Sequence, residues 1–172
     1  MKSLSHYLIP DRMYDTVYSI PFSEYYERGV RVIVFDIDNT LAPYSVTAPD
    51  EKIKNFLFSV RDMGFEIAFV SNNSPQRVET FNESLGFFAV PDAHKPEKRA
   101  LAPVLAHFGV APEKTLFVGD QLLTDVLSAR VHGAQAVTVS PIEKVESRFF
   151  RFKRLLEKPF IRAYRRREER NR

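Results

Sequence analysis

The sequence predicts an α/β fold, in which a parallel sheet carries helices on both faces. Short apolar runs alternate with amphipathic stretches of helical periodicity from residue 30 to residue 139, as in repeated strand–helix units. The runs are almost wholly apolar, which is typical of strands buried on both faces of a parallel sheet. A chain of 172 residues is long enough for one such core. We therefore predict one domain over residues 1–143, followed by a basic helical tail over residues 144–172.

The predicted elements follow this alternation along the chain. Residues 1–29 are rich in tyrosine, and we expect them to pack as a layer against the sheet, with a short helix over residues 23–28. The predicted strands are residues 30–35, 65–70, 87–90, 115–118 and 134–139. The predicted helices are residues 51–63, 75–85, 97–108 and 122–132, with Asp50 as the cap of the first and Ser74 or Asn73 as the cap of the second. A glycine follows each of these four helices, as is common where a helix ends.

Composition excludes several classes of function. The chain has no cysteine, which excludes disulfides, thiol catalysis and thiolate metal sites. It has no apolar run of about 18 residues, so we expect no transmembrane helix. The apolar run in residues 1–15 is short and interrupted, and does not predict a signal peptide. We therefore expect a cytoplasmic protein that is soluble or peripheral at a membrane.

The tail is basic, whereas the domain before it is acidic. Residues 144–172 contain twelve Lys and Arg against four Asp and Glu. An apolar stripe at helical spacing lies among these cations, and it comprises Val145, Phe149, Phe152 and Leu156. We expect Pro159 to break this helix. Three interpretations stay open: docking of the stripe on the sheet, which we favour, contact with an anionic membrane surface, or binding to nucleic-acid phosphates. For nucleic acid, we find no stacking motif or groove-reading element.

Two carboxylates, Asp36 and Asp38, follow the first buried strand. Ligands of open parallel sheets bind beyond the carboxyl ends of the strands. Two like charges this close repel each other unless a cation lies between them, so the pair is suited to Mg²⁺. The alternative is a solvated turn, because Asp, Asn and Thr are also common turn residues. The spacing of these two residues alone does not decide between the two interpretations.

The ends of the later strands add further polar side chains. Ser71 follows the strand at 65–70, Lys95 lies in the loop after residues 87–90, and Asp120 and Asp125 follow the strand at 115–118. A phosphoryl-transfer site needs a nucleophile, a metal, hydrogen-bond donors and a fixed cation, and each has a candidate here. The chain contains neither a GxxxxGK[ST] nor a GxGxxG motif, so no nucleotide-binding loop competes for this fold.

The stretches DIDNTL, VSN, HKP and GDQLLTD match, in order, the four motifs of the haloacid dehalogenase (HAD) superfamily of aspartate-nucleophile phosphatases. The chain resembles this family over about residues 30–140. Within it, LIPDRMYDTVYSI, DIDNTLAPY and GDQLLTDV look like the subclass IIIA group typified by YqeG and by mitochondrial phosphatidylglycerophosphate phosphatase. The resemblance implies a Rossmann-like three-layer sandwich. Neither position at which the family carries a large cap domain has an insert.

The resemblance also implies a role for each motif residue. Asp36 would attack phosphorus and form an aspartyl-phosphate, while Asp38 would act first as general acid and then as general base. Ser71 and the backbone amide of Asn72 would bind the phosphoryl oxygens. Lys95 would neutralise the phosphate charge and keep Asp36 ionised.

For the cofactor, the resemblance implies Mg²⁺. Its ligands would be a carboxylate oxygen of Asp36, the backbone carbonyl of Asp38, and Asp120. Asp125 would be a weaker ligand or lie just outside the coordination sphere. Thr40 would brace the loop through its hydroxyl group.

An open site suits a substrate that provides its own cover, such as a macromolecule, a lipid head group or a second subunit. We therefore expect a Mg²⁺-dependent phosphomonoester hydrolase, and the most specific hypothesis is dephosphorylation of phosphatidylglycerophosphate at the membrane surface. One alternative is a soluble phosphatase for another small or macromolecular phosphomonoester. Another is a non-catalytic scaffold that binds anions through the tail. The oligomeric state does not follow from the sequence.

Overall fold

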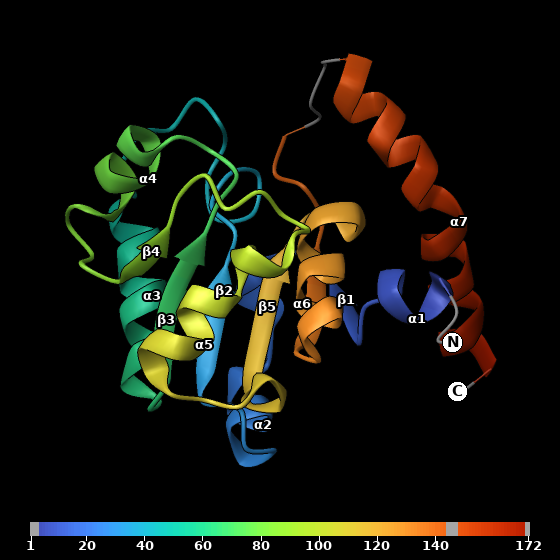
Figure 1. The fold of residues 1–172 in the computed structure, drawn as a ribbon, viewed down its shortest axis with the longest axis horizontal. Helices are drawn as coiled ribbons and strands as arrows, with labels where there is room; N and C mark the ends of the chain where they lie inside the picture. The colour runs from blue at the N-terminus through green and yellow to red at the C-terminus, as the bar shows by residue number, and fades with distance from the viewer. Residues whose placement is uncertain (1–3, 144–147, 171–172) are drawn as a thin grey trace.

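The computed structural model describes residues 4–143 and 148–170, with side chains for residues 4–143 and 152–170 (Figure 1). Its centre is one six-stranded sheet in which every strand pair is parallel, in the order β1-β6-β5-β2-β3-β4. The strands are β1 (Arg12–Tyr14), β2 (Val32–Phe35), β3 (Glu66–Val70), β4 (Phe88–Val90), β5 (Thr115–Gly119) and β6 (Gln135–Val139). The predicted parallel α/β fold is confirmed.

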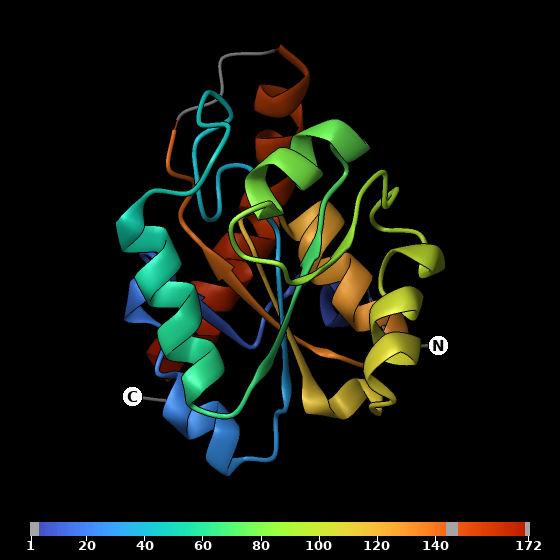
Figure 2. The ribbon, with the colours of Figure 1, turned by 90° about the vertical axis from the view of Figure 1, so that its left-hand side faces the viewer.

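Helices cover both faces of the sheet, which gives three layers (Figure 2). The helices are α1 (Leu4–Leu8), α2 (Phe22–Glu27), α3 (Glu51–Asp62), α4 (Pro75–Asn82), α5 (Ala102–Phe108), α6 (Leu127–His132) and α7 (Arg148–Arg170). Short 3₁₀ turns occupy Val17–Ser19, Lys98–Ala100 and Pro112–Lys114, and one π-helical turn, Leu122–Val126, leads into α6.

Each strand contributes side chains to both layers, because successive side chains of a strand point to opposite faces. In β2, Ile33 and Phe35 pack toward α2, α3 and α4, whereas Val32 and Val34 pack toward α5 and α6. All four side chains are fully buried. The continuous apolar run in the sequence is therefore the signature of burial on both faces.

The topology places the end of β2 at the centre of the molecule. The chain moves from β2 outward to β3 and β4, then crosses back to β5 on the other side of β2. The connection after β2 therefore runs toward one edge of the sheet, and the connection after β5 runs toward the other. Such a switch point opens a crevice beyond the carboxyl ends of the strands. Neither cap position holds an inserted domain: residues 36–50 form a loop before α3, and β3 and β4 are separated by α4 alone.

The predicted elements differ from the observed ones mainly at their ends. Asp50 and Ser74 cap α3 and α4 by accepting the backbone N–H groups of Ile53 and Arg77. The helix expected from residue 97 starts as a 3₁₀ turn, and the one expected from residue 122 starts as a π turn. Strand β1 was not predicted, because its three residues show no periodicity and its only strand partner is β6 at the sheet edge.

The expected break of the last helix at Pro159 is wrong, because α7 continues through it to Arg170. A proline within a helix leaves the carbonyl four residues earlier without its donor. Here Leu155 provides that carbonyl, and both Leu155 and Pro159 are exposed. Solvent can therefore hydrate the freed oxygen, while Phe160 and Ile161 pack on the core beyond the proline.

The favoured docking of the apolar stripe on the sheet is wrong for the two members whose side chains are described. Phe152 is 58% exposed and Leu156 is 46% exposed, and Leu155 beside them is 57% exposed. Val145 and the side chain of Phe149 lie outside the described residues. Helix α7 instead turns Glu157 and Tyr164 toward the rest of the protein, together with Phe160 and Ile161 beyond the proline.

None of the described helices combines the length and the apolar composition that crossing a lipid bilayer requires.

Candidate active site

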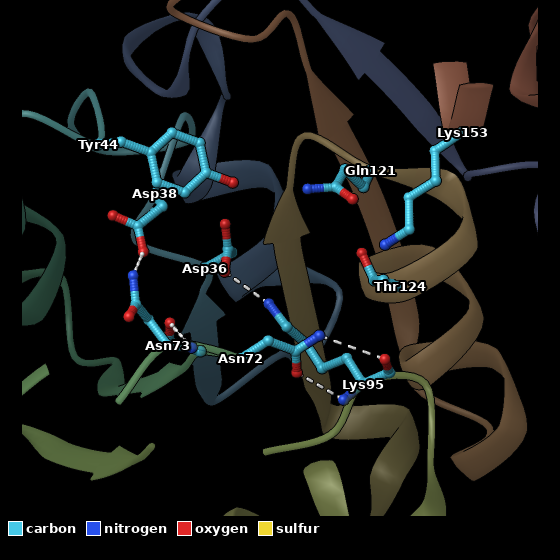
Figure 3. Close-up of a pocket in the computed structure, with 10 residues that line it drawn as sticks. Asp36, Asp38, Tyr44, Asn72, Asn73, Lys95, Gln121, Thr124 and Lys153 are labelled. Carbon is cyan, nitrogen blue, oxygen red and sulfur yellow. Dashed lines mark hydrogen bonds and ion pairs between the residues drawn. The ribbon is translucent and has the colours of Figure 1, made fainter. Parts of the chain in front are cut away.

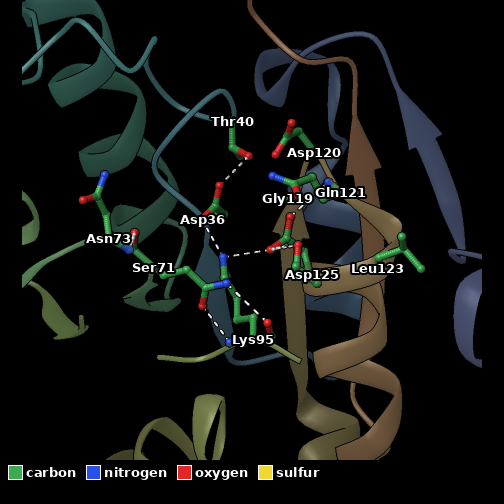
Figure 4. Close-up of polar contacts among 12 residues, drawn as sticks. Asp36, Thr40, Ser71, Asn73, Lys95, Gly119, Asp120, Gln121, Leu123 and Asp125 are labelled. Carbon is green, nitrogen blue, oxygen red and sulfur yellow. Dashed lines mark hydrogen bonds and ion pairs between the residues drawn. The ribbon is translucent and has the colours of Figure 1, made fainter. Parts of the chain in front are cut away.

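The site begins with a buried lysine between two carboxylates, one directly after β2 and one in the π turn that follows β5 (Figure 4). Lys95 Nζ lies 2.5 Å from Asp36 Oδ1 and 2.8 Å from Asp125 Oδ1. Burial lowers the pKa of Lys95, but the attraction of Asp125 and Asp36 raises it above its ordinary value overall. Lys95 therefore stays charged and holds the two carboxylates together from a loop 59 residues away from Asp36 in the chain.

Asp36 is the central side chain of this arrangement. Its Oδ2 accepts a hydrogen bond of 3.2 Å from Thr40 Oγ1. Burial raises the pKa of Asp36 to about 8, Lys95 opposes this rise, and Asp125 and Asp120 add to it. The lysine alone therefore does not balance the buried negative charge, and a further cation beside Asp36 would favour its ionised form.

Three carboxylates converge beside the lysine. Asp36, Asp120 and Asp125 each offer an oxygen within 4.8 Å of the other two. Asp120 is held through Oδ2 by Arg154, while its Oδ1 is buried and has no hydrogen-bond partner within the described part of the chain. Burial raises the pKa of Asp120 to about 6, with Asp125 adding to the rise and Arg154 opposing it. A hard divalent cation prefers oxygen ligands such as these carboxylates, and the unpartnered oxygen of Asp120 is available to bind one.

Asp125 has several partners that the predicted metal role did not include, among them the hydroxyl group of Thr124, which donates to Oδ1 at 3.4 Å. Besides its ion pair with Lys95, its Oδ2 accepts the backbone N–H of Gln121 at 3.0 Å. Its proximity to Gly119 is also informative, because a Cβ atom at that position would collide with the Asp125 side chain. The glycine before Asp120 thus gives the Asp125 carboxylate room to approach the end of β5.

Asp38 points away from the cluster formed by Asp36, Asp120 and Asp125. Its Oδ1 pairs with Arg77 Nη2 at 2.9 Å, and its Oδ2 accepts from Asn73 Nδ2 at 3.1 Å. Asn73 lies in the loop between β3 and α4, and Arg77 lies in the first turn of α4. The segment after β3 therefore holds Asp38, which follows β2. Sequence reasoning missed both residues, although their position directly after the strand at 65–70 was a usable signal.

Ser71 and Asn72, at the end of β3, lie beside the same pocket. Ser71 is buried, and its Oγ accepts the backbone N–H of Asn73 at 3.0 Å. The side chain of Asn72 bonds to both backbone groups of Lys95, accepting from N at 2.6 Å and donating to O at 3.3 Å. Asn72 therefore fixes the loop that carries the lysine, a contact that its predicted backbone role does not include.

These side chains surround a pocket of about 330 Å³ (Figure 3). Five of its lining residues were predicted from the sequence, namely Asp36, Asp38, Ser71, Asn72 and Lys95. The other five are Tyr44, Asn73, Gln121, Thr124 and Lys153. In Figure 3, Tyr44 and Asp38 lie on one side of Asp36, and Gln121, Thr124 and Lys153 lie on the other. Lys153 belongs to α7, so the basic tail contributes to the wall of the pocket.

Comparisons with known proteins agree with this geometry. A family model described as HAD-hydrolase-like matches residues 93–141, the stretch that contains Lys95, Asp120 and Asp125. The chain is 29% identical over 163 residues to the protein named "Probable phosphatase YqeG" of Bacillus subtilis (strain 168), and the match covers 95% of each chain.

Two solved structures share the fold. An uncharacterized protein from Listeria monocytogenes serotype 4b superposes with a TM-score of 0.55 at 16% identity, over 69% of this chain and 84% of that one. CbbY from Rhodobacter sphaeroides, solved in complex with phosphate, superposes with a TM-score of 0.52 at 13% identity, over 70% of this chain and 90% of that one. At these identities, the likeness concerns the fold alone.

Proposed function

We propose that this chain is a phosphatase of the HAD superfamily, and that it hydrolyses phosphomonoesters with Mg²⁺ and through a covalent intermediate on Asp36. The observation that carries the proposal is the convergence of Asp36, Asp120 and Asp125 around Lys95 at the switch point of the sheet. This arrangement places a nucleophile (Asp36), a fixed cation (Lys95) and several carboxylates that could bind a metal within one pocket.

In the first step, a carboxylate oxygen of Asp36 attacks phosphorus, and the bond from phosphorus to the leaving oxygen breaks. Asp38 donates a proton to that oxygen, so the product leaves as an alcohol. Lys95 offsets negative charge on the phosphoryl group from its position 2.5 Å from Asp36 Oδ1. Asn73 and Arg77 hold Asp38 by both of its carboxylate oxygens, which fixes the direction of its approach.

In the second step, water attacks phosphorus, and the bond between phosphorus and the Asp36 oxygen breaks. Asp38 accepts the proton from the water, inorganic phosphate leaves, and both aspartates return to their starting states. Splitting one displacement into two lets a single pair of carboxylates serve the leaving group and the water in turn.

The cluster of Asp36, Asp120 and Asp125 fits Mg²⁺, since Asp120 Oδ1 is buried with no hydrogen-bond partner among the described residues and the converging donors are all oxygens. Asp36 and Asp120 would hold the ion, with the backbone carbonyl of Asp38 completing the set, and Asp125 would remain with Lys95. When bound, the ion offsets charge on the phosphoryl oxygens.

Metal addition and removal test this proposal. We expect wild-type protein to release phosphate from p-nitrophenyl phosphate with Mg²⁺ and to stop when EDTA is added. Mg²⁺ should also stabilise the fold without substrate, by about 2.7 kcal/mol at a hundredfold excess over its Kd, measured by denaturant unfolding. Asp120→Asn should lose most of this stabilisation, whereas Asp62→Asn, an exposed carboxylate on α3, should keep it. Equal activity in EDTA and Mg²⁺ would contradict the metal assignment.

A lipid head group at an anionic membrane surface is the more specific substrate that we propose, with phosphatidylglycerophosphate as the compound. Its support is the exposed apolar face of α7, formed by Phe152, Leu155 and Leu156. Lys153, on the same helix, lines the pocket, and Lys158 beside the face is exposed. Apolar side chains among cations are the pattern of helices that bind anionic bilayers. The pocket also has no inserted domain over it that would exclude a bilayer.

Vesicles of phosphatidylglycerol that contain phosphatidylglycerophosphate test this choice. We expect wild-type protein to release phosphate from them and to sediment with them. Leu156→Asp should reduce both several-fold, because it places a negative charge on the apolar face, while hydrolysis of p-nitrophenyl phosphate stays unchanged. Met63→Asp, at an exposed position after α3, is the matched control. If the protein hydrolysed soluble phosphomonoesters but released no phosphate from phosphatidylglycerophosphate, the result would instead support a soluble phosphatase.

A further inference from the structure

Helix α7 reaches the candidate active site through one arginine. Arg154 Nη1 donates to the backbone oxygen of Asp120 at 2.5 Å, and Arg154 Nη2 pairs with Asp120 Oδ2. One guanidinium group thus holds the main chain and the side chain of the same residue. Because the guanidinium fork is rigid and planar, this double contact fixes the direction of the Asp120 side chain.

The consequence is visible in the other oxygen of that carboxylate. Arg154 occupies Oδ2, whereas Oδ1 of Asp120 is buried and accepts no hydrogen bond from the residues that the structure describes. Asp120 offers one carboxylate oxygen within 4.8 Å of an oxygen of Asp36 and of Asp125, and Oδ1 is the oxygen that Arg154 leaves available. Arg154 therefore selects which oxygen of Asp120 is available to a cation.

A second residue of α7 holds Arg154 in place. Glu157 is only 1% exposed, and its Oε2 lies 3.3 Å from Arg154 Nη1. Its Oε1 accepts the backbone N–H groups of Leu122 and Leu123 at 2.8 and 3.1 Å. These two amides begin the π turn that carries Asp125. Glu157 thus joins α7 to the segment after β5 and orients Arg154 toward Asp120.

We propose that α7 is a working part of the metal centre, with Arg154 as a positioning residue that presents Asp120 Oδ1 to the divalent cation and Glu157 as its support. The inference rests on the proposed function, because it assigns the cation to the same carboxylates. It adds a requirement for a helix that lies outside all four sequence motifs. Carboxylates that bind metals are commonly oriented by such outer hydrogen bonds, whose loss weakens metal affinity or activity by about 10- to 100-fold.

Substrate-free metal titration tests the role of Arg154. We expect Arg154→Met to weaken Mn²⁺ binding by about 10- to 100-fold, measured with the full chain by electron paramagnetic resonance of free Mn²⁺. Arg154→Lys should recover part of the affinity, because it restores the charge without the fork. Arg162→Met, an exposed arginine on the same helix, should bind Mn²⁺ as wild type does. Circular dichroism and melting of each variant identify those that remain folded.

Two further measurements separate positioning from a general loss of structure. In the Asp120→Asn background, adding Arg154→Met should cause no further loss of Mn²⁺ affinity, because the arginine acts through that carboxylate. Glu157→Gln should weaken binding less than Arg154→Met, because it leaves the guanidinium in place. Wild-type affinity in a folded Arg154→Met variant would overturn the inference and leave the proposed function standing. Failure of wild-type protein to bind Mn²⁺ or Mg²⁺ would overturn the proposed function itself.

Discussion

Asp36→Asn is expected to abolish phosphate release, by about 10⁴-fold or more, while the protein remains folded. The change removes the attacking oxygen charge, and the remaining residues cannot form the covalent intermediate. The amide keeps the shape of the side chain, and its oxygen can still accept from Lys95 Nζ, 2.5 Å away in the wild-type structure. Initial rates with p-nitrophenyl phosphate and Mg²⁺ measure the effect.

The stability of the same variant gives an independent check. The pKa of Asp36 is raised by burial to about 8, which means that ionising it within the fold is unfavourable relative to the unfolded chain. A neutral amide avoids that cost, so in EDTA the variant should unfold at no lower denaturant concentration than wild type. Asp62→Asn serves as the control, since that carboxylate is exposed on α3. Activity within a few-fold of wild type would reject Asp36 as the nucleophile.

Lys95→Met is expected to produce the largest loss of stability, about 3–5 kcal/mol in the free energy of unfolding. The lysine side chain is 3% exposed, and its removal leaves Asp36 and Asp125 buried without their shared cation. Removing one partner of a buried ion pair costs about this much, because the charge that remains is uncompensated. Urea unfolding in EDTA measures the change, and phosphate release should fall with it.

A double variant tests the reason for that loss. Adding Asp125→Asn to Lys95→Met removes the charge of one of the two buried carboxylates that have lost their cation. Part of the lost free energy of unfolding should therefore return. Lys158→Met, at an exposed position of α7, should leave stability nearly unchanged. If Lys95→Met were as stable as wild type in EDTA, the buried cation would have no role in balancing the carboxylates.

The parallel sheet could be predicted because its signals are local. Each central strand is an apolar run that is buried on both faces, and each crossover carries a helix with one apolar face. The positions of Asp36, Ser71 and Asp120 then follow from the rule that parallel strands end at one edge. Strand β1 escaped prediction because its pairing with β6 depends on residues more than a hundred positions away.

The contacts made by α7 could not be predicted for a related reason. Arg154 and Glu157 lie within a run of charges that looks like a solvated helix face, and both depend on partners about 35 residues earlier. The apolar stripe predicted that Phe152 and Leu156 are buried, but both are exposed, whereas Glu157 is buried. Periodicity locates a helix, but it does not show which face of the helix is buried. Here the buried face includes Glu157, because its carboxylate accepts backbone N–H groups of a neighbouring segment.

The order of synthesis follows from the position of Arg154 and Glu157 in the chain. Every strand leaves the ribosome before α7 does, so a nascent chain can pair its whole sheet while Asp120 still lacks the arginine that orients it. The orientation of Asp120 by α7 would then come after pairing of the sheet, as a late step in assembling the carboxylate cluster.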